Sequence, residues 1–262
     1  MMFEKLIYCV NAVVLLGAGG SSAWAASDAT CSGGTITSGV YSSLNITGAC
    51  TVDKGPVTVL GNLTVLPGGS LVAVVGGFGA TPPSPNLTVD GNLDVQANGT
   101  LVLGCELIAF ICANDPGPFP GTYATRETVG GNLTAENAYQ VVVHHTAIGG
   151  NVTVSGGGGG VSCAAFQYGD FEDDTIGGNL TITGWQSCWL GFFRDTIMRN
   201  VNFNGNVTAD PDGNEIANNT ILGNLNCSGN NPTPHTGDSV GGPSTVVGNT
   251  NGQCNSPGLI LP

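Results

Sequence analysis

A short alternation of apolar and polar residues recurs along most of the chain. The unit is Gly-Asn, then Leu or Val, then Thr, Asp or Asn, then an apolar residue, as in Gly61-Asn62-Leu63-Thr64-Val65. Further complete copies begin at Gly91, Gly131, Gly150, Gly178, Gly205 and Gly223. Side chains two residues apart share one face of a strand, so the pattern predicts short β-strands with one buried face.

The spacing of these units favours stacked coils. Between Gly131 and Gly223 successive copies are 19, 28, 27 and 18 residues apart, which suits one coil per step. Gly and Asn both tolerate the left-handed backbone of a sharp turn, and the same turn precedes the same strand each time. We therefore expect an all-β parallel β-helix. An antiparallel β-sandwich is the alternative, because it also uses short strands separated by turns.

The C-terminal part of the chain carries a family resemblance. Residues 219–232 and 247–254, with the looser Gly-Gly-Asn-(Leu or Val)-Thr unit back to about Gly130, resemble a group of largely uncharacterised, exported bacterial β-helix proteins. The resemblance implies a right-handed parallel β-helix and export, and it implies no activity.

The N-terminus predicts a secreted or cell-surface protein. Lys5, an apolar stretch over residues 6–16 and Ala23-Trp24-Ala25 match the three parts of a secretory signal peptide. We expect a signal over residues 1–25 and a single repeat domain over residues 26–262. No later apolar run is long enough to cross a bilayer, so we expect no membrane span once the signal is removed.

The cysteines predict disulfides. Of nine cysteines, Cys9 lies in the signal segment, which leaves eight in the mature chain. An even number of cysteines in an exported chain argues for disulfide pairing. The remaining eight are Cys31, Cys50, Cys105, Cys112, Cys163, Cys188, Cys227 and Cys254. The pairs 163/188 and 227/254 are separated by about one coil, while 31/50 and 105/112 would close the N-terminal end and a loop. Sequence alone permits 105 pairings.

Composition excludes one class of partner. Gly supplies 43 of the 262 residues, well above the roughly 7% of ordinary domains. Charged side chains make up only 9% of the chain, against about 25% in ordinary domains. The net charge is −13, with five basic residues scattered along the chain. Phosphate backbones require clustered cations, so we expect no nucleic-acid partner.

Two segments suggest ligand sites. Trp185, Trp189, Phe192 and Arg194 could form an aromatic and polar platform for a glycan or a surface protein. The alternative is that these aromatic side chains fill the interior. Asp210, Asp212 and Glu215 place oxygen ligands around a Gly turn, so calcium is the cofactor that the sequence suggests. The alternative here is a solvated acidic turn.

No motif assigns an activity. Glu172, Asp173 and Asp174 form the densest acidic run, but the Gly-His-Gly and Arg-x-Lys elements of polygalacturonases, which share the β-helix fold, are absent. We therefore expect a non-enzymatic structural or interaction module. The alternative is a carbohydrate-active hydrolase or lyase that uses this acidic run beside Arg194. A third hypothesis is recognition of an ordered surface such as ice by outward threonines, namely Thr134, Thr153, Thr181 and Thr208.

Overall fold

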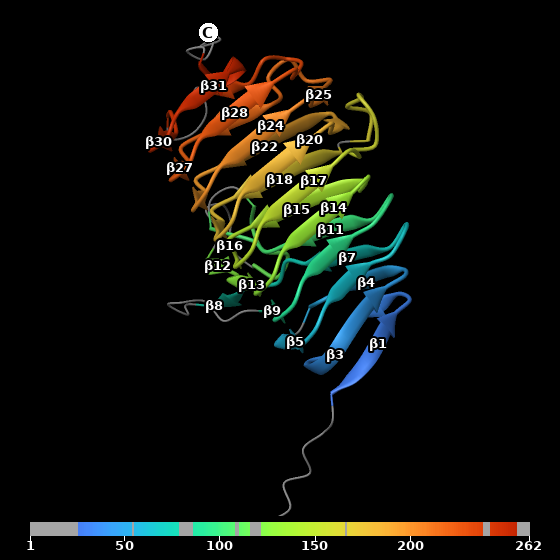
Figure 1. The fold of residues 1–262 in the computed structure, drawn as a ribbon. Coiled ribbons are helices and arrows are strands. Elements are labelled where there is room, and N and C mark those ends of the chain that lie inside the picture. Colours follow the sequence, from blue (N-terminus) through green and yellow to red (C-terminus); the bar gives the residue numbers. More distant parts are fainter. Residues whose placement is uncertain are drawn as a thin grey trace, which may run out of the picture.

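The chain folds into a stack of coils that rises from β1 at one end to β31 at the other (Figure 1). The structure, a computed structural model, describes residues 26–53, 55–78, 86–107, 110–115, 122–165, 167–237 and 242–255. The predicted signal segment therefore lies outside the described residues. Among the described residues, none belongs to a helix that is long and apolar enough to span a membrane.

Two large parallel sheets, here called sheet A and sheet B, form the walls of the stack. Sheet A contains β1 (Ser27–Cys31), β3 (Gly39–Ile46), β5 (Val57–Val59), β6 (Leu63–Val65), β9 (Leu87–Val89), β10 (Leu93–Val95), β13 (Glu127–Val129), β14 (Leu133–Glu136), β16 (Thr146–Ile148), β17 (Val152–Ser155), β19 (Thr175–Ile176), β20 (Leu180–Thr183), β23 (Thr196–Ile197), β24 (Val201–Asn204), β27 (Thr220–Ile221), β28 (Leu225–Ser228), β30 (Thr245–Val246) and β31 (Thr250–Gly252). Sheet B contains β2 (Gly34–Thr35), β4 (Ala49–Thr51), β7 (Ser70–Ala73), β11 (Thr100–Leu103), β15 (Gln140–His144), β18 (Tyr168–Glu172), β22 (Trp189–Phe193), β26 (Glu215–Ala217) and β29 (His235–Thr236).

The remaining elements are small. The strands β8 (Gly77–Phe78) and β12 (Tyr123–Ala124) pair antiparallel, β21 (Gln186–Ser187) and β25 (Val207–Thr208) pair parallel, and a 3-10 helix covers Gln253–Asn255. Every pairing within sheets A and B is parallel and joins like positions of successive coils, which confirms the parallel β-helix and excludes the antiparallel sandwich.

The core follows the predicted alternation. Leu63 and Val65 are fully buried and align with Leu93 and Val95 of the next coil, whereas Thr64 between them is partly exposed. The apolar positions of successive coils therefore fill one continuous interior.

The asparagines of the repeat stack into a ladder at the turn. Asn62 Oδ1 accepts a hydrogen bond of 2.9 Å from the backbone N–H of Asn92. The same contact is repeated through the asparagines at positions 132, 151, 179, 200, 224 and 249. A backbone donor is satisfied at each turn, which gives the Gly-Asn pair its structural role.

The copy of the repeat that begins at Gly205 does not take part in the asparagine ladder. The ladder passes through Asn200 rather than Asn206, which lies in the interior and accepts a hydrogen bond from Trp185 N at 3.0 Å. Thr208 is consequently buried, and its expected place as an outward threonine was wrong. Asn202 occupies that outward position instead.

Four disulfides staple the stack at the pairs expected from the spacing. They join Cys31 to Cys50, Cys105 to Cys112, Cys163 to Cys188 and Cys227 to Cys254. The pairs at 163/188 and 227/254 each connect positions about one coil apart, so they tie neighbouring coils together.

Candidate functional site

Charged side chains gather on the outer face of sheet B, where three neighbouring coils run through β15, β18 and β22. Strand register places His144 beside Glu172, and Val142 beside Asp170. Because side chains alternate along a strand, these polar residues share the outer face while Phe171 between them points into the core.

The residue after each of these strands adopts the left-handed backbone conformation. The φ angle is 50° at His145, 57° at Asp173 and 57° at Arg194. Each backbone N–H donates to a carbonyl of the next coil, as His145 N does to Glu172 O at 2.8 Å. Asp and His are tolerated in this conformation, but Arg is uncommon there. The stacked turns set these three side chains in one column next to the outer face of sheet B.

A disulfide-bonded insertion brings a further carboxylate to the same place. Residues 104–126 connect β11 to β13 and contain the Cys105–Cys112 bond. Glu106, next to that disulfide, is buried, and its Oε1 accepts a hydrogen bond of 3.1 Å from Arg194 Nη2. The insertion is thus held against coils that lie far along the sequence.

Arg194 is the centre of the arrangement. Its Nε donates to both oxygens of Asp173 at 3.0 Å, and its Nη2 donates to Asp173 Oδ2 at 2.8 Å and to Glu172 Oε2. We call the group Glu106, His144, Asp170, Glu172, Asp173 and Arg194 the charged cluster. Charge-assisted hydrogen bonds of this kind are strong. The cluster therefore fixes the relative positions of the insertion, of β18 and of the turn that follows β22.

His144 lies under the insertion and is 1% exposed. Its Nε2 lies 3.2 Å from Asp170 Oδ2, its Nδ1 lies 3.9 Å from Glu106 Oε1, and the ring of Phe110 packs on the imidazole with centroids 4.6 Å apart. Burial alone would lower the pKa of His144. The hydrogen bond to Asp170 and the interaction with Glu106 outweigh burial and raise the pKa to about 10.

The carboxylates of the charged cluster divide into two kinds. Burial and the charge of Asp170 raise the pKa of Glu172 to about 8, against the opposing effects of His144 and Arg194. Burial and a hydrogen bond to Glu106 raise the pKa of Asp173 to about 6. Although burial opposes it, the interactions of Glu106 with His144, Asp173 and Arg194 lower its pKa. Of these three carboxylates, Glu106 is therefore the one that remains ionised, and Glu172 and Asp173 bind protons more readily.

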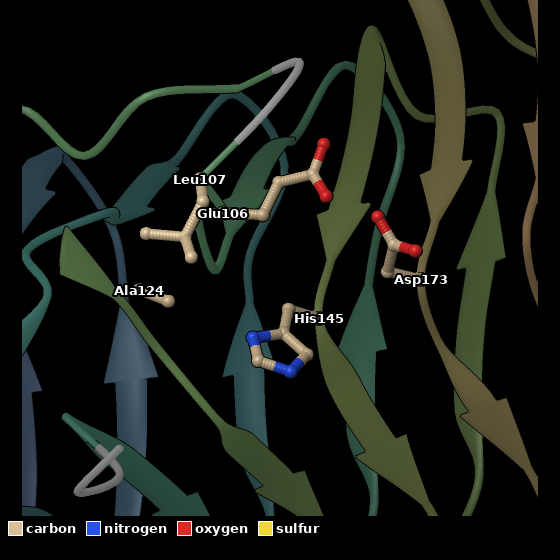
Figure 2. A pocket seen from close by; sticks show the side chains of 5 residues that line it. All are labelled: Glu106, Leu107, Ala124, His145 and Asp173. Carbon is tan, nitrogen blue, oxygen red and sulfur yellow. The ribbon is translucent and has the colours of Figure 1, made fainter. Parts of the chain in front are cut away.

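A cavity of about 300 Å³ opens beside the charged cluster, lined by Glu106, Leu107, Ala124, His145 and Asp173 (Figure 2). Figure 2 shows the carboxylates of Glu106 and Asp173 turned toward one another above the ring of His145. Burial and the nearby charge of Arg126 lower the pKa of His145, so this imidazole is neutral near pH 7. A neutral base and a carboxyl group with a raised pKa thus line the same cavity.

Asp174 does not belong to this surface, which corrects its place in the predicted acidic run. It lies in the interior, where its Oδ1 accepts from Thr146 N at 2.7 Å and its own N–H donates to Asp195 Oδ1 at 2.8 Å. Asn219 extends this interior series of hydrogen bonds, because its Oδ1 accepts from Asp195 N at 2.9 Å. Burial raises the pKa of both aspartates well above the usual range, helped at Asp174 by the charge of Asp195 and at Asp195 by the charges of Asp173 and Glu172.

The aromatic platform predicted from the sequence was wrong in two of its four members. Trp185 and Phe192 are fully buried in the core, so neither can contact a ligand at the surface. Trp189 is partly exposed and stacks on Phe193 with ring centroids 5.6 Å apart, while its Nε1 donates to Glu215 Oε2 at 3.0 Å. The fourth member, Arg194, belongs to the charged cluster.

The predicted calcium ligands do not converge, which corrects that expectation. Glu215 is turned toward Trp189, and Asp210 Oδ1 accepts from the backbone N–H of Asp212 at 3.0 Å. The side chain of Asp212 is 60% exposed and lies 3.8 Å from His235 Nδ1. Within the described residues, Asp210, Asp212 and Glu215 are not among the sets of three side chains whose ligand atoms lie close enough together to hold one metal ion.

The outer face of sheet A carries two long polar rows. The threonine row contains Thr58, Thr88, Thr128, Ala147, Thr175, Thr196, Thr220 and Thr245, which align coil upon coil. The mixed row contains Thr64, Asp94, Thr134, Thr153, Thr181, Asn202, Asn226 and Asn251. All of these residues are partly or fully exposed. Neighbouring coils are about 4.8 Å apart, so the rows repeat hydrogen-bonding groups at that interval.

Comparison with known proteins identifies no relative. No family model, curated protein or solved structure was found to match the chain.

Proposed function

We propose that the protein is an exported, non-enzymatic β-helix module that binds a glycan polymer at a surface or outside the cell. The observation that carries the proposal is the pair of polar rows on sheet A. Fifteen of their sixteen positions are uncharged, the exception being Asp94, and the groups recur at the coil spacing. A polymer whose hydroxyl groups also repeat can form many weak hydrogen bonds to such a face at once.

The charged cluster supports the non-enzymatic part of the proposal. Arg194 donates to Glu172, Asp173 and Glu106, so the acidic side chains already have a strong partner. Their contacts hold the insertion against sheet B. A general acid or base needs access to a substrate, and Glu172 is largely buried.

Co-sedimentation tests the proposal directly. The protein is mixed with insoluble cellulose and chitin, and with soluble polysaccharides in an affinity gel. We expect binding to at least one of these glycans, without release of reducing ends. A variant with Thr196→Tyr and Thr220→Tyr should bind at least tenfold more weakly, because two bulky rings interrupt the threonine row.

The matched control is Thr100→Tyr, which places the same side chain on the partly exposed outer face of sheet B. This variant should bind like the wild type. If none of the glycans binds, the glycan proposal is wrong. If the double variant binds as tightly as the wild type, sheet A is not the contact surface.

A carbohydrate-active enzyme is the second candidate, favoured by one observation. Asp173, whose pKa is raised to about 6, and the neutral His145 line one cavity of about 300 Å³. Such a pair could transfer protons during cleavage of a glycosidic bond. Release of reducing ends or of unsaturated, ultraviolet-absorbing sugars by the wild type, lost in Asp173→Asn, would establish this candidate and displace the first.

A further inference from the structure

Three residues of the charged cluster are spaced as a set of possible metal ligands. One ligand atom from each of Glu106, His144 and Glu172 lies within 4.8 Å of the other two, and all three residues are buried. The other set at this spacing within the described residues contains Cys163 and Cys188, whose sulfurs are joined in a disulfide and cannot bind a metal.

We propose that Glu106, His144 and Glu172 bind one divalent transition-metal ion of the zinc class. One imidazole nitrogen and two carboxylate oxygens are a donor set that suits Zn²⁺, whereas Ca²⁺ and Mg²⁺ prefer oxygen ligands alone.

The orientation of His144 is the main argument. The side chain is 1% exposed, and its Nδ1 is buried without a hydrogen-bond partner while it faces Glu106 Oε1 at 3.9 Å. Leaving a buried polar nitrogen without a partner is costly, so its direction toward the Glu106 carboxylate indicates a missing ligand.

The second imidazole nitrogen supports the same assignment. His144 Nε2 lies 3.2 Å from Asp170 Oδ2. Histidines that bind metals through one nitrogen commonly hydrogen-bond a carboxylate through the other, which fixes the ring and increases the basicity of the ligating nitrogen. Asp170 is therefore a positioning residue for this site.

The charges also leave room for a cation. Arg194 pairs with Asp173 through both Nε and Nη2. Its Nη2 also reaches Glu106 Oε1 and Glu172 Oε2, so one guanidinium serves several carboxylates. Glu106, Asp170 and Glu172 lie around one imidazole, and the four acidic side chains of the charged cluster outnumber its two basic ones, which favours a divalent ion. Bound there, it would tie the insertion to β15 and β18.

Equilibrium dialysis of the full mature protein tests the site, after chelator treatment and with ZnCl₂ as the probe. We expect one Zn²⁺ per chain. His144→Gln and Glu106→Gln should each weaken binding at least tenfold, and Asp170→Asn should weaken it about 10- to 100-fold. His235→Gln is the matched control, since that histidine lies outside the charged cluster, and it should bind like the wild type.

Three results would overturn the proposal. The first is a wild type that retains no Zn²⁺, and the second is unchanged binding in His144→Gln. The third is tighter binding of Mg²⁺ or Ca²⁺ than of Zn²⁺, which would contradict the metal class. If the variants fail to fold, Co²⁺ titration of the wild type still decides. Visible absorption should saturate at one equivalent and disappear on addition of Zn²⁺, and its absence would refute the site.

Discussion

The alternation of inward and outward side chains can be tested at two adjacent residues of a middle coil. Leu180 begins β20, is fully buried and pairs with Val152 and Val201 of the neighbouring coils. Thr181 beside it is partly exposed on the mixed row. Replacing each residue by Asp introduces the same charge on opposite sides of one strand.

The expected costs differ by an order of magnitude. Truncating a buried Leu costs about 2–5 kcal/mol, and an unpaired buried charge adds several kcal/mol more. The same charge at an exposed position costs about 0.5 kcal/mol or less. In a domain of this size 1 kcal/mol shifts the melting temperature by roughly 2–4 °C. Leu180→Asp should therefore lower it by about 10 °C or more, or prevent folding, and Thr181→Asp by about 2 °C or less.

Thermal unfolding followed by circular dichroism measures both variants, with Leu180→Ala as an intermediate. Because neighbouring coils share one core, hydrogen exchange in Leu180→Asp should also accelerate in the adjacent strands β17 and β24. Equal melting temperatures for the two Asp variants, or a lower one for Thr181→Asp, would refute the assigned faces.

Three further predictions follow from named interactions. Intact mass before and after reduction should show four disulfides in the mature chain, and more than two free thiols would contradict them. Asp195 is buried and its pKa is raised, so the folded state binds more protons than the unfolded state above about pH 4. Stability should consequently fall as the pH rises from 5 to 9, and Asp195→Asn should raise the melting temperature at pH 7 and flatten this dependence. Arg194→Met should destabilise the fold by roughly 3–5 kcal/mol and speed proteolysis of residues 104–126, whereas Arg199→Met, at an exposed position, should change neither.

The strands of sheet A could be predicted because their signal is local. In Gly178-Asn179-Leu180-Thr181-Ile182, the turn, the alternation and the buried face all lie within five residues. The same local signal misled at Gly205, where Asn206 forms interior hydrogen bonds with Trp185 and Asn230 and does not belong to the asparagine ladder at the turn. In this coil the ladder asparagine is Asn200. It is preceded by Arg199 where the other copies have Gly, so the pattern did not identify it as a copy of the repeat.

In the aromatic strand β22, the pairing with neighbouring strands decides which face is buried, and the sequence alone does not. The sequence places Leu190 and Phe192 on one face and Trp189 and Phe193 on the other, but it does not say which face is buried. Both faces carry large apolar side chains, so hydrophobicity does not choose between them. Pairing of Phe192 with Phe171 in the core decides it. Phe192 was therefore assigned to a ligand platform although it fills the interior.

The charged cluster could not be predicted because its members meet through stacking rather than through sequence proximity. The acidic run at Glu172 and its proximity to Arg194 were visible in the sequence, but Glu106 is 88 residues from Arg194 and contacts it through the insertion. Coil length varies, since the ladder asparagines at 132, 151, 179, 200 and 224 lie 19, 28, 21 and 24 residues apart. No fixed period therefore aligns His145, Asp173 and Arg194. What aligns them is the left-handed turn that each occupies after a strand of sheet B, and that turn is a property of the stacked backbone. A β-helix of uneven coils can thus gather charged groups at one level while its sequence displays only the regular strands that support them.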